Sequence, residues 1–184
     1  KIGQAYVNAG YYGAVVYAFD GSGLMAWQAS GGTSDMNAPA FDDANRMYVH
    51  NGDTLNVHDA RNGTSLGSIG TTPYGMQTSH HGTAVVGGPD SVTALWGNSY
   101  SESASRPLRN YSIDALAVRW TTAKQYQPYP AIANGVIYAT ANNPRSFDAI
   151  DEKTGQILWS WVPGTSDGAF YRNVVVTDNL VFIR

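Results

Sequence analysis

The chain has 184 residues, enough for a domain with a hydrophobic core, and only 14% of them are charged, while 20 are glycine and 12 are tyrosine. This composition is typical of short strands joined by tight turns, and it disfavours a helical fold. The net charge of −3 without a basic cluster argues against nucleic acid or an anionic membrane surface as a partner, and the lack of cysteine excludes disulfides and thiolate metal sites.

The first predicted elements lie between residues 3 and 30. An alternating run surrounds Tyr6, a second run ends at Asp20, and a turn with Gly23 leads into a strand with Trp27. The aspartate can accept hydrogen bonds from the N–H groups of the turn that follows it. The glycine supplies the positive φ that a bulged turn needs. We therefore expect a β-hairpin closed by Asp20, with the tryptophan on its second strand.

The same arrangement recurs three more times along the chain. The later aspartates are Asp59, Asp114 and Asp151, and two of these copies end in a tryptophan, Trp120 or Trp159. In the copy at Asp59, Gly67 stands where the tryptophan is expected. The copy at Asp114 lacks the turn glycine that Gly63 and Gly155 supply in its neighbours. We expect all four aspartates to form the same kind of turn.

A second marker, an alternating run after a turn, precedes each copy. Its central residues follow one another at intervals of 42 to 46 residues and are Tyr6, Tyr48, Ala94, Tyr138 and Phe182. Short apolar runs before these turns add one more strand, so each unit has four short strands, A to D. We expect a single domain over 1–184, with repeats at about 1–30, 36–70, 80–122, 129–162 and an incomplete one at 172–184.

The repeat predicts an all-β fold. A single four-stranded sheet is not stable alone, but radial stacking of such sheets buries their faces and gives a β-propeller. We expect about four antiparallel four-stranded blades, the first without its A strand. The final A strand could join the N-terminal strands and close a four-bladed ring. The redundant B strand at the end argues against closure and favours an arc.

The string AIDEKTGQILW, from Ala149 to Trp159, resembles the tryptophan-docking (PQQ-like) repeat of the quinoprotein-type β-propellers. The upstream string PAIANGVIYAT is similar to the A–B hairpin of that family, and the resemblance extends over nearly the whole chain. It implies a propeller of seven or eight blades, of which this chain would be a piece. It also implies a periplasmic or extracellular location.

The resemblance implies two function classes. The first is a non-enzymatic binding or scaffold propeller without a cofactor, which is our prediction. The alternative is a fragment of an alcohol or sugar dehydrogenase that uses PQQ and calcium. The catalysis of those enzymes needs a carboxylate base, an asparagine and an acidic calcium ligand at the central axis. Because the repeat aspartates occupy turn positions, we expect no catalytic residue within this chain.

No metal site is expected either. The four histidines, His50, His58, His80 and His81, lack the spacing of metal ligands. The segment 42–45 has two aspartates and an asparagine, but it lacks the distant carboxylate of a calcium loop and is predicted to be an A–B turn.

The segment Gly97–Leu108 departs from the repeat. It is a polar, serine-rich insertion between the B and C strands of the third unit, and insertions in repeat arrays usually lie on one face. Tryptophan, tyrosine and arginine are favoured at binding hot spots. The predicted contact residues for a protein or small ligand are Trp96, Tyr100, Arg106 and Arg109. We expect the last three to be exposed beside the link Asn51–Thr54; further partners would be missing blades or a second copy.

The segment Phe147–Trp161 is predicted to be a hairpin and not a cofactor site. We expect Asp151, Thr154 and Gly155 to form a hydrogen-bonded turn, and Trp159 to pack against an adjacent blade.

Overall fold

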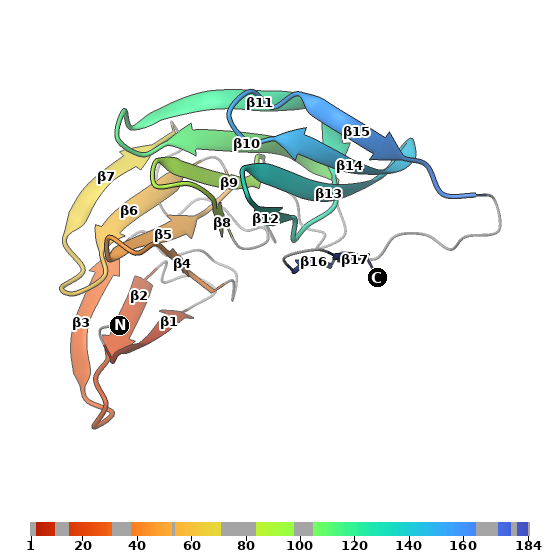
Figure 1. The fold of residues 1–184 in the computed structure, drawn as a ribbon. Helices are drawn as coiled ribbons and strands as arrows, with labels where there is room; N and C mark the ends of the chain where they lie inside the picture. Colours follow the sequence, from red (N-terminus) through yellow and green to blue (C-terminus); the bar gives the residue numbers. More distant parts are fainter. Residues whose placement is uncertain are drawn as a thin grey trace. The chain divides into compact units, whose positions relative to one another are not determined.

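The computed structural model describes residues 3–9, 15–30, 38–52, 54–70, 84–97, 105–164, 173–177 and 180–183. All regular elements among these residues are β-strands, paired as antiparallel sheets (Figure 1). The chain divides into two compact units, and each is described by itself. The first contains Lys1–Ala84 and Gly97–Ser101, and the second contains Val85–Trp96 and Glu102–Arg184.

The first unit has two sheets. One has three strands in the order β1 (Ala5–Ala9), β2 (Val15–Phe19) and β3 (Met25–Ser30). The other has four strands in the order β4 (Ala40–Phe41), β5 (Arg46–His50), β6 (Leu55–Asp59) and β7 (Ser65–Ile69). Buried Val16, Met47, Val49 and Ala60 form its core, with Tyr6 and Trp27 packed against them.

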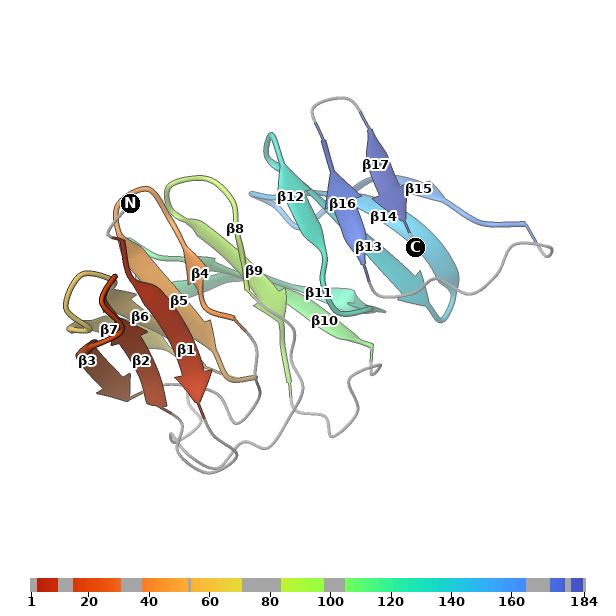
Figure 2. The same ribbon diagram turned by 90° about the horizontal axis from the view of Figure 1, so that it is seen from below.

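The second unit has three sheets. The first runs in spatial order β8 (Val85–Val86), β9 (Ser91–Leu95), β10 (Arg106–Ser112) and β11 (Ala117–Tyr126). The second runs β12 (Ala131–Ala133), β13 (Val136–Asn142), β14 (Arg145–Asp151) and β15 (Ile157–Trp161), and the third is the pair β16 (Val174–Val176) and β17 (Val181–Ile183). In Figure 2, β16 lies beside β12 and β13, which it contacts.

The middle strands of the four-stranded sheets are buried on both faces, whereas their last strands are exposed. In β6 and β14, nearly every residue is buried, but β15 is exposed along its whole length. Burial on both faces is the expected consequence of stacking sheets against one another. Three of the sheets have the predicted four strands, and the predicted all-β architecture of antiparallel four-stranded sheets is confirmed.

The hairpin between the third and fourth strands of the repeat carries a β-bulge at the same place in three sheets. The register shifts directly before the conserved turn, at Ala18/Phe19, Val57/His58 and Ala149/Ile150. The glycines of these turns have φ values of 82°, 75° and 72° and are Gly23, Gly63 and Gly155. The predicted bulged turn with a left-handed glycine is therefore confirmed at these three positions.

None of the described residues forms a helix long and apolar enough to cross a membrane.

Candidate functional site

Two of the repeat aspartates close their turns through the backbone, as predicted. Asp20 Oδ1 accepts hydrogen bonds from Ser22 N (2.8 Å) and Leu24 N (3.1 Å). Asp151 Oδ1 accepts one from the N and one from the Oγ1 of Thr154, both at 2.8 Å. Hydrogen bonds from the side chains of Ser22 and Thr154 are the main reason that the pKa of each carboxyl is below its usual value. These carboxylates are committed to the fold.

The turn at Asp59 is also closed by the aspartate, and here an arginine side chain donates additional hydrogen bonds to the carboxylate. Asp59 Oδ1 accepts hydrogen bonds from the N and the Nε of Arg61, both at 2.9 Å, and Oδ2 accepts one from Nη2 at 2.5 Å. These hydrogen bonds and the positive charge of Arg61 lower the pKa of Asp59 to about 2. The carboxylate therefore stays ionised throughout the physiological range.

The turn at Asp114 is built differently from the other three. Leu116 takes the left-handed conformation (φ 47°) that glycine has in those turns, and Asp114 N donates to Asp90 Oδ1 at 2.6 Å. Asp90 also accepts a hydrogen bond from Ser112 Oγ and forms an ion pair with Arg119 at 2.9 Å. The expectation of one common turn chemistry is thus too simple, because here an aspartate from the preceding hairpin holds the turn.

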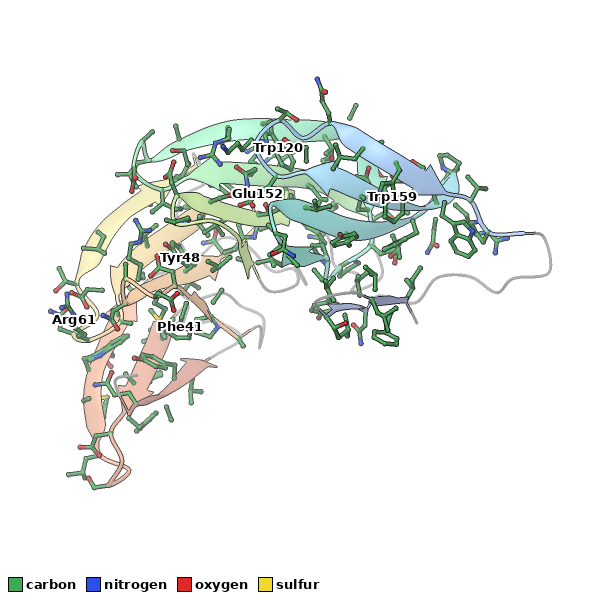
Figure 3. The ribbon with its side chains drawn as sticks, viewed as in Figure 1. Phe41, Tyr48, Arg61, Trp120, Glu152 and Trp159 are labelled. Atoms are coloured by element: carbon green, nitrogen blue, oxygen red, sulfur yellow. The ribbon has the colours of Figure 1, made fainter. Side chains whose placement is uncertain are left out.

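Trp120 docks onto the glycine of the next sheet in the second unit. A Cβ atom placed on Gly155 would lie only 2.7 Å from Trp120 Cδ2, closer than real Cβ contacts come. The indole Nε1 donates to the carbonyl oxygen of Glu152 at 2.9 Å (Figure 3). Glycine is therefore required at 155 both for its positive φ and for the closeness of the ring.

Trp27 docks onto Gly63 in the same way within the first unit. A Cβ atom at Gly63 would lie 2.6 Å from Trp27 Cε3. Here, however, the indole Nε1 is buried and has no hydrogen-bond partner among the described residues. The carbonyl of Ala60, which corresponds to that of Glu152, instead accepts a hydrogen bond from the hydroxyl of Tyr6 at 2.9 Å.

A surface groove lies beside each docking site. In the second unit it has a volume of about 650 Å³, and Glu152, which is buried, accepts a hydrogen bond there from Gly88 N at 2.9 Å. This groove is lined by Gly88–Ser91, Arg119, Asn134–Val136 and Asp151–Lys153. A groove of about 490 Å³ in the first unit is lined by Gly3, Gln4, Tyr6, Phe41, Asp42, Asp43, Asn45 and Ala60. Sequence reasoning missed Glu152, since its only signal was its place after the turn aspartate.

A buried polar cluster joins β11 to β14 in the second unit. Asp148, fully buried, accepts hydrogen bonds through Oδ2 from Lys124 Nζ (2.7 Å) and from the hydroxyl of Tyr126 (2.9 Å), and Lys124 also contacts Ser146. Burial acts to raise the pKa of Asp148, but hydrogen bonds, led by that of Lys124, outweigh burial and keep the pKa low. The ion pair between Lys124 and Asp148 therefore links a strand of one sheet to a strand of the next.

Polar residues two positions apart in each strand, 124 with 126 and 146 with 148, are the pattern that indicates this cluster. Residues with this spacing lie on one face of a strand.

Two of the four predicted contact residues are brought together. The guanidinium carbon of Arg109 lies 3.8 Å from the centroid of the Trp96 ring, a cation–π geometry. Arg109 Nε also donates to Thr121 Oγ1 at 3.0 Å. At the beginning of the inserted segment, Gly97 N donates to Gly52 O at 3.1 Å, so this end of the segment lies beside the link Asn51–Thr54.

The other two residues do not support the predicted site in the same way. Arg106 was expected to be exposed, which is wrong, because its exposed fraction is 5%. It begins β10 and lies on the same face of the strand as Leu108 and Asn110, which are also buried. Arg109 was predicted to be exposed, but it is half-buried. Tyr100 lies outside the described residues.

The turn predicted for Asp151, Thr154 and Gly155 is confirmed, but the expected position of Trp159 is not. Its exposed fraction is 47%, and its ring contacts Tyr138 and Phe147 of its own sheet, with centroid distances of 6.2 Å and 5.7 Å. Among the described residues, the ring contacts given for this tryptophan are therefore with its own sheet, and the expected packing against an adjacent blade is not seen.

The residues described do not fit the calcium and PQQ site that the dehydrogenase resemblance implies. Among them, no three histidine, aspartate or glutamate side chains are grouped so that they could hold a metal ion. The buried carboxylates of Asp59, Asp148 and Glu152 are instead bonded to Arg61, to Lys124 and to Gly88. No step of a quinone-dependent oxidation can be derived from these side chains.

Comparison with known proteins gives a relative by sequence and many similar solved structures, two of which are described below. The chain is 31% identical over 110 residues to the dehydrogenase subunit of a quinone alcohol dehydrogenase from Gluconobacter oxydans, a match that covers 54% of this chain and 14% of that protein. No protein-family model matches the chain.

The two solved structures show the fold. BamB from Moraxella catarrhalis has a TM-score of 0.64 at 19% identity, with 98% of this chain and 51% of that one covered. A europium-containing methanol dehydrogenase has a TM-score of 0.62 at 13% identity, with 87% and 40% covered. The chain thus spans about half the length or less of the proteins that it matches. The resemblance predicted from the repeat is confirmed, and the chain has a β-propeller fold similar to that of the quinoprotein-type (PQQ-like) propellers.

Proposed function

We propose that the chain is part of a non-enzymatic binding or scaffold propeller, and that it holds a protein partner through Trp96 and Arg109. The observation that carries this proposal is the stacking of the Arg109 guanidinium on the Trp96 ring. The stack and the hydrogen bond to Thr121 restrict the arginine before a partner arrives, so less conformational entropy is lost on binding. Tryptophan and arginine are also the residues most enriched at binding hot spots.

The use of the carboxylates supports a scaffold. Asp20, Asp59 and Asp151 close turns, and Asp148 links two of the three sheets of the second unit through Lys124. Partner contacts at the inserted segment, with Tyr100 in it, remain part of the proposal. A periplasmic or extracellular location is proposed from the family resemblance.

The second candidate is a segment of a quinone-dependent alcohol dehydrogenase. The 31% identity to such a subunit in Gluconobacter oxydans favours it. In that case the calcium and PQQ ligands would be supplied by residues other than those described.

The test is made on the full-length protein, produced in the organism in which it occurs. A photo-crosslinking amino acid replaces Ala123, an exposed residue two positions after Thr121 on β11, and a control places it at Leu66, an exposed residue on β7. A scaffold should give a crosslinked protein from position 123 only, and Arg109→Ala should weaken its capture while the melting temperature changes little. Saturable PQQ binding with calcium, together with reduction of a dye by ethanol, would contradict the scaffold and support the dehydrogenase.

A further inference from the structure

Arg109 is the central one of three residues that lie side by side across the sheet β8–β11. The register places it opposite Ala94 of β9 on one side and opposite Thr121 of β11 on the other. The stack on Trp96 restricts the plane of the guanidinium, and the hydrogen bond from Nε to Thr121 Oγ1 restricts its rotation within that plane. The arginine side chain is therefore held in one orientation.

The outer end of this guanidinium remains open. Among the described residues, the terminal nitrogens Nη1 and Nη2 of Arg109 have no hydrogen-bond partner, and neither is one of the buried polar atoms that lack a partner. Both nitrogens are therefore accessible to solvent. Two parallel N–H groups at this end of an arginine match the two oxygens of a carboxylate.

Arg109 also differs from the other cations of β10 and β11. These are either buried, as Arg106 is, or paired with an aspartate, as Arg119 and Lys124 are. Within the part of the chain that the structure describes, Arg109 has no carboxylate partner. Its single positive charge matches the single negative charge of a carboxylate, whereas a phosphate monoester carries nearly two.

The strand beside Arg109 is the edge of its sheet. Among the described residues, β11 pairs only with β10 (Figure 1), and its side chains at 121, 123 and 125 are exposed. Thr121 lies near the middle of β11, so a segment that lies along this strand passes the arginine and continues on both sides of it. A carboxylate that reaches Arg109 is therefore expected to belong to a side chain within such a segment and not to a chain end.

We infer that Arg109 binds the side-chain carboxylate of an aspartate or glutamate in an extended segment of the partner; this rests on the proposed function, in which Trp96 and Arg109 hold that partner. One carboxylate oxygen accepts a hydrogen bond from Nη1 and the other accepts one from Nη2. The indole ring excludes water from one face of the guanidinium, which strengthens the ion pair. An asparagine or glutamine in the same place would offer one acceptor oxygen and no charge.

The probes are immobilised libraries of short peptides that are acetylated and amidated at their ends. The central residue is glutamate, glutamine or phosphoserine, and the other positions vary among uncharged residues, so the central side chain carries the only charge. The full-length protein is tested unchanged and as the variants Arg109→Gln, Arg109→Lys and Lys153→Gln. Lys153 is an exposed turn residue of another sheet, and its replacement changes the net charge by the same amount as Arg109→Gln.

The glutamate library should retain the unchanged protein at least about fivefold more strongly than the glutamine library. Arg109→Gln should abolish this preference, and Arg109→Lys should reduce it, because an ammonium group lacks the two parallel donors. Lys153→Gln should leave the preference unchanged. Added salt should weaken the preference, as expected for a pair that solvent reaches.

Equal retention by the glutamate and glutamine libraries, or a preference that survives Arg109→Gln, would overturn the inference. Stronger retention by the phosphoserine library that Arg109→Gln abolishes would also overturn it, because the site would then be assigned to a phosphate group. The crosslinking experiment separates these results from the proposed function. A partner captured from position 123 together with equal retention would leave the scaffold standing and overturn the carboxylate alone. A glutamate preference that depends on Arg109, without any captured partner, would contradict the scaffold and leave the carboxylate site standing.

Discussion

Two docking sites with the same motif, one in each unit, are completed in different ways. Trp120 and Trp27 both lie on a left-handed glycine, but among the described residues only Trp120 has a hydrogen-bond partner for its indole nitrogen. In the first unit, Tyr6 donates to the carbonyl that the indole would otherwise use. In the second unit the register places Thr93 at the position of Tyr6, and its hydroxyl oxygen accepts a hydrogen bond from Asn110 Nδ2. A residue two strands away therefore decides whether the motif forms its polar contact.

The largest effect is expected from valine at the docked glycines. Gly155→Val and Gly63→Val should each lower the free energy of unfolding by about 3 to 5 kcal/mol, because a left-handed valine and a collision with the ring add together. Gly23→Val provides the control, since its φ is also positive but a Cβ atom there has no neighbour within 4 Å. Urea unfolding followed by fluorescence should give a loss of about 1 to 3 kcal/mol for this control. Equal losses at all three positions would mean that docking contributes nothing.

The second largest effect is a difference in the stability lost when each of the two tryptophans is replaced by phenylalanine. Trp120→Phe removes the hydrogen bond to Glu152 O, whereas Trp27→Phe removes an indole N–H that already lacks a partner. The packing loss is similar at both sites, so Trp120→Phe should be more destabilising by about 1 to 2 kcal/mol. Denaturant midpoints of the two variants measure this difference. A larger loss for Trp27→Phe would contradict the assignment of partners.

A smaller effect is expected at Tyr6. Tyr6→Phe should lower the free energy of unfolding by no more than about 1 kcal/mol, because the freed carbonyl of Ala60 becomes available to the Trp27 indole. In the Tyr6→Phe background, Trp27→Phe should then be more destabilising than in the original protein. An unchanged cost for Trp27→Phe in that background would show that Tyr6 does not compete with the indole.

The smallest effect concerns the turn beneath the first docking site. The folded pKa of Asp59 is about 2, below the ordinary 3.8, so its contribution to stability is present above about pH 4 and is lost as the pH falls toward 2. In Arg61→Ala the pKa should return toward the ordinary range, while that of Asp151, which is closed by Thr154, stays unchanged. Carboxyl carbon NMR titration measures both. An Asp59 pKa that does not respond to Arg61→Ala would mean that the backbone alone sets it.

Much of the fold could be predicted from the sequence because the residues that form each turn of the repeat lie next to one another in the chain. Asp151, Thr154 and Gly155 are adjacent in the chain, so the turn could be predicted without knowledge of any distant contact. Arg106 could not be placed from its polarity. Its spacing of two and four positions from Leu108 and Asn110 puts it on the buried face of β10, whereas its charge suggested an exposed position. Inserted polar residues near a strand end are thus better assigned by the period of the strand than by their charge.

The contacts between sheets were harder to predict. Asp148 is more than 20 residues from both Lys124 and Tyr126, and only the packing of two sheets brings it to them. Trp159 has the same place in the repeat as Trp120, but its surroundings differ because docking depends on the sheet that follows. Local sequence therefore specifies the docking residue and its turn, while the neighbouring sheet decides whether the contact forms.

The central claim is that the tryptophan of one sheet and the turn glycine of the next form a single energetic unit. A double-mutant cycle on Trp120→Ala and Gly155→Ala in the second unit measures it most directly. The strain of a left-handed alanine is present with and without the tryptophan and cancels in the cycle, so the remaining term is the collision of the Cβ atom with the ring. We expect the double variant to be more stable than the sum of the single losses predicts, by at least about 1 kcal/mol. Additivity within about 0.5 kcal/mol would contradict the account.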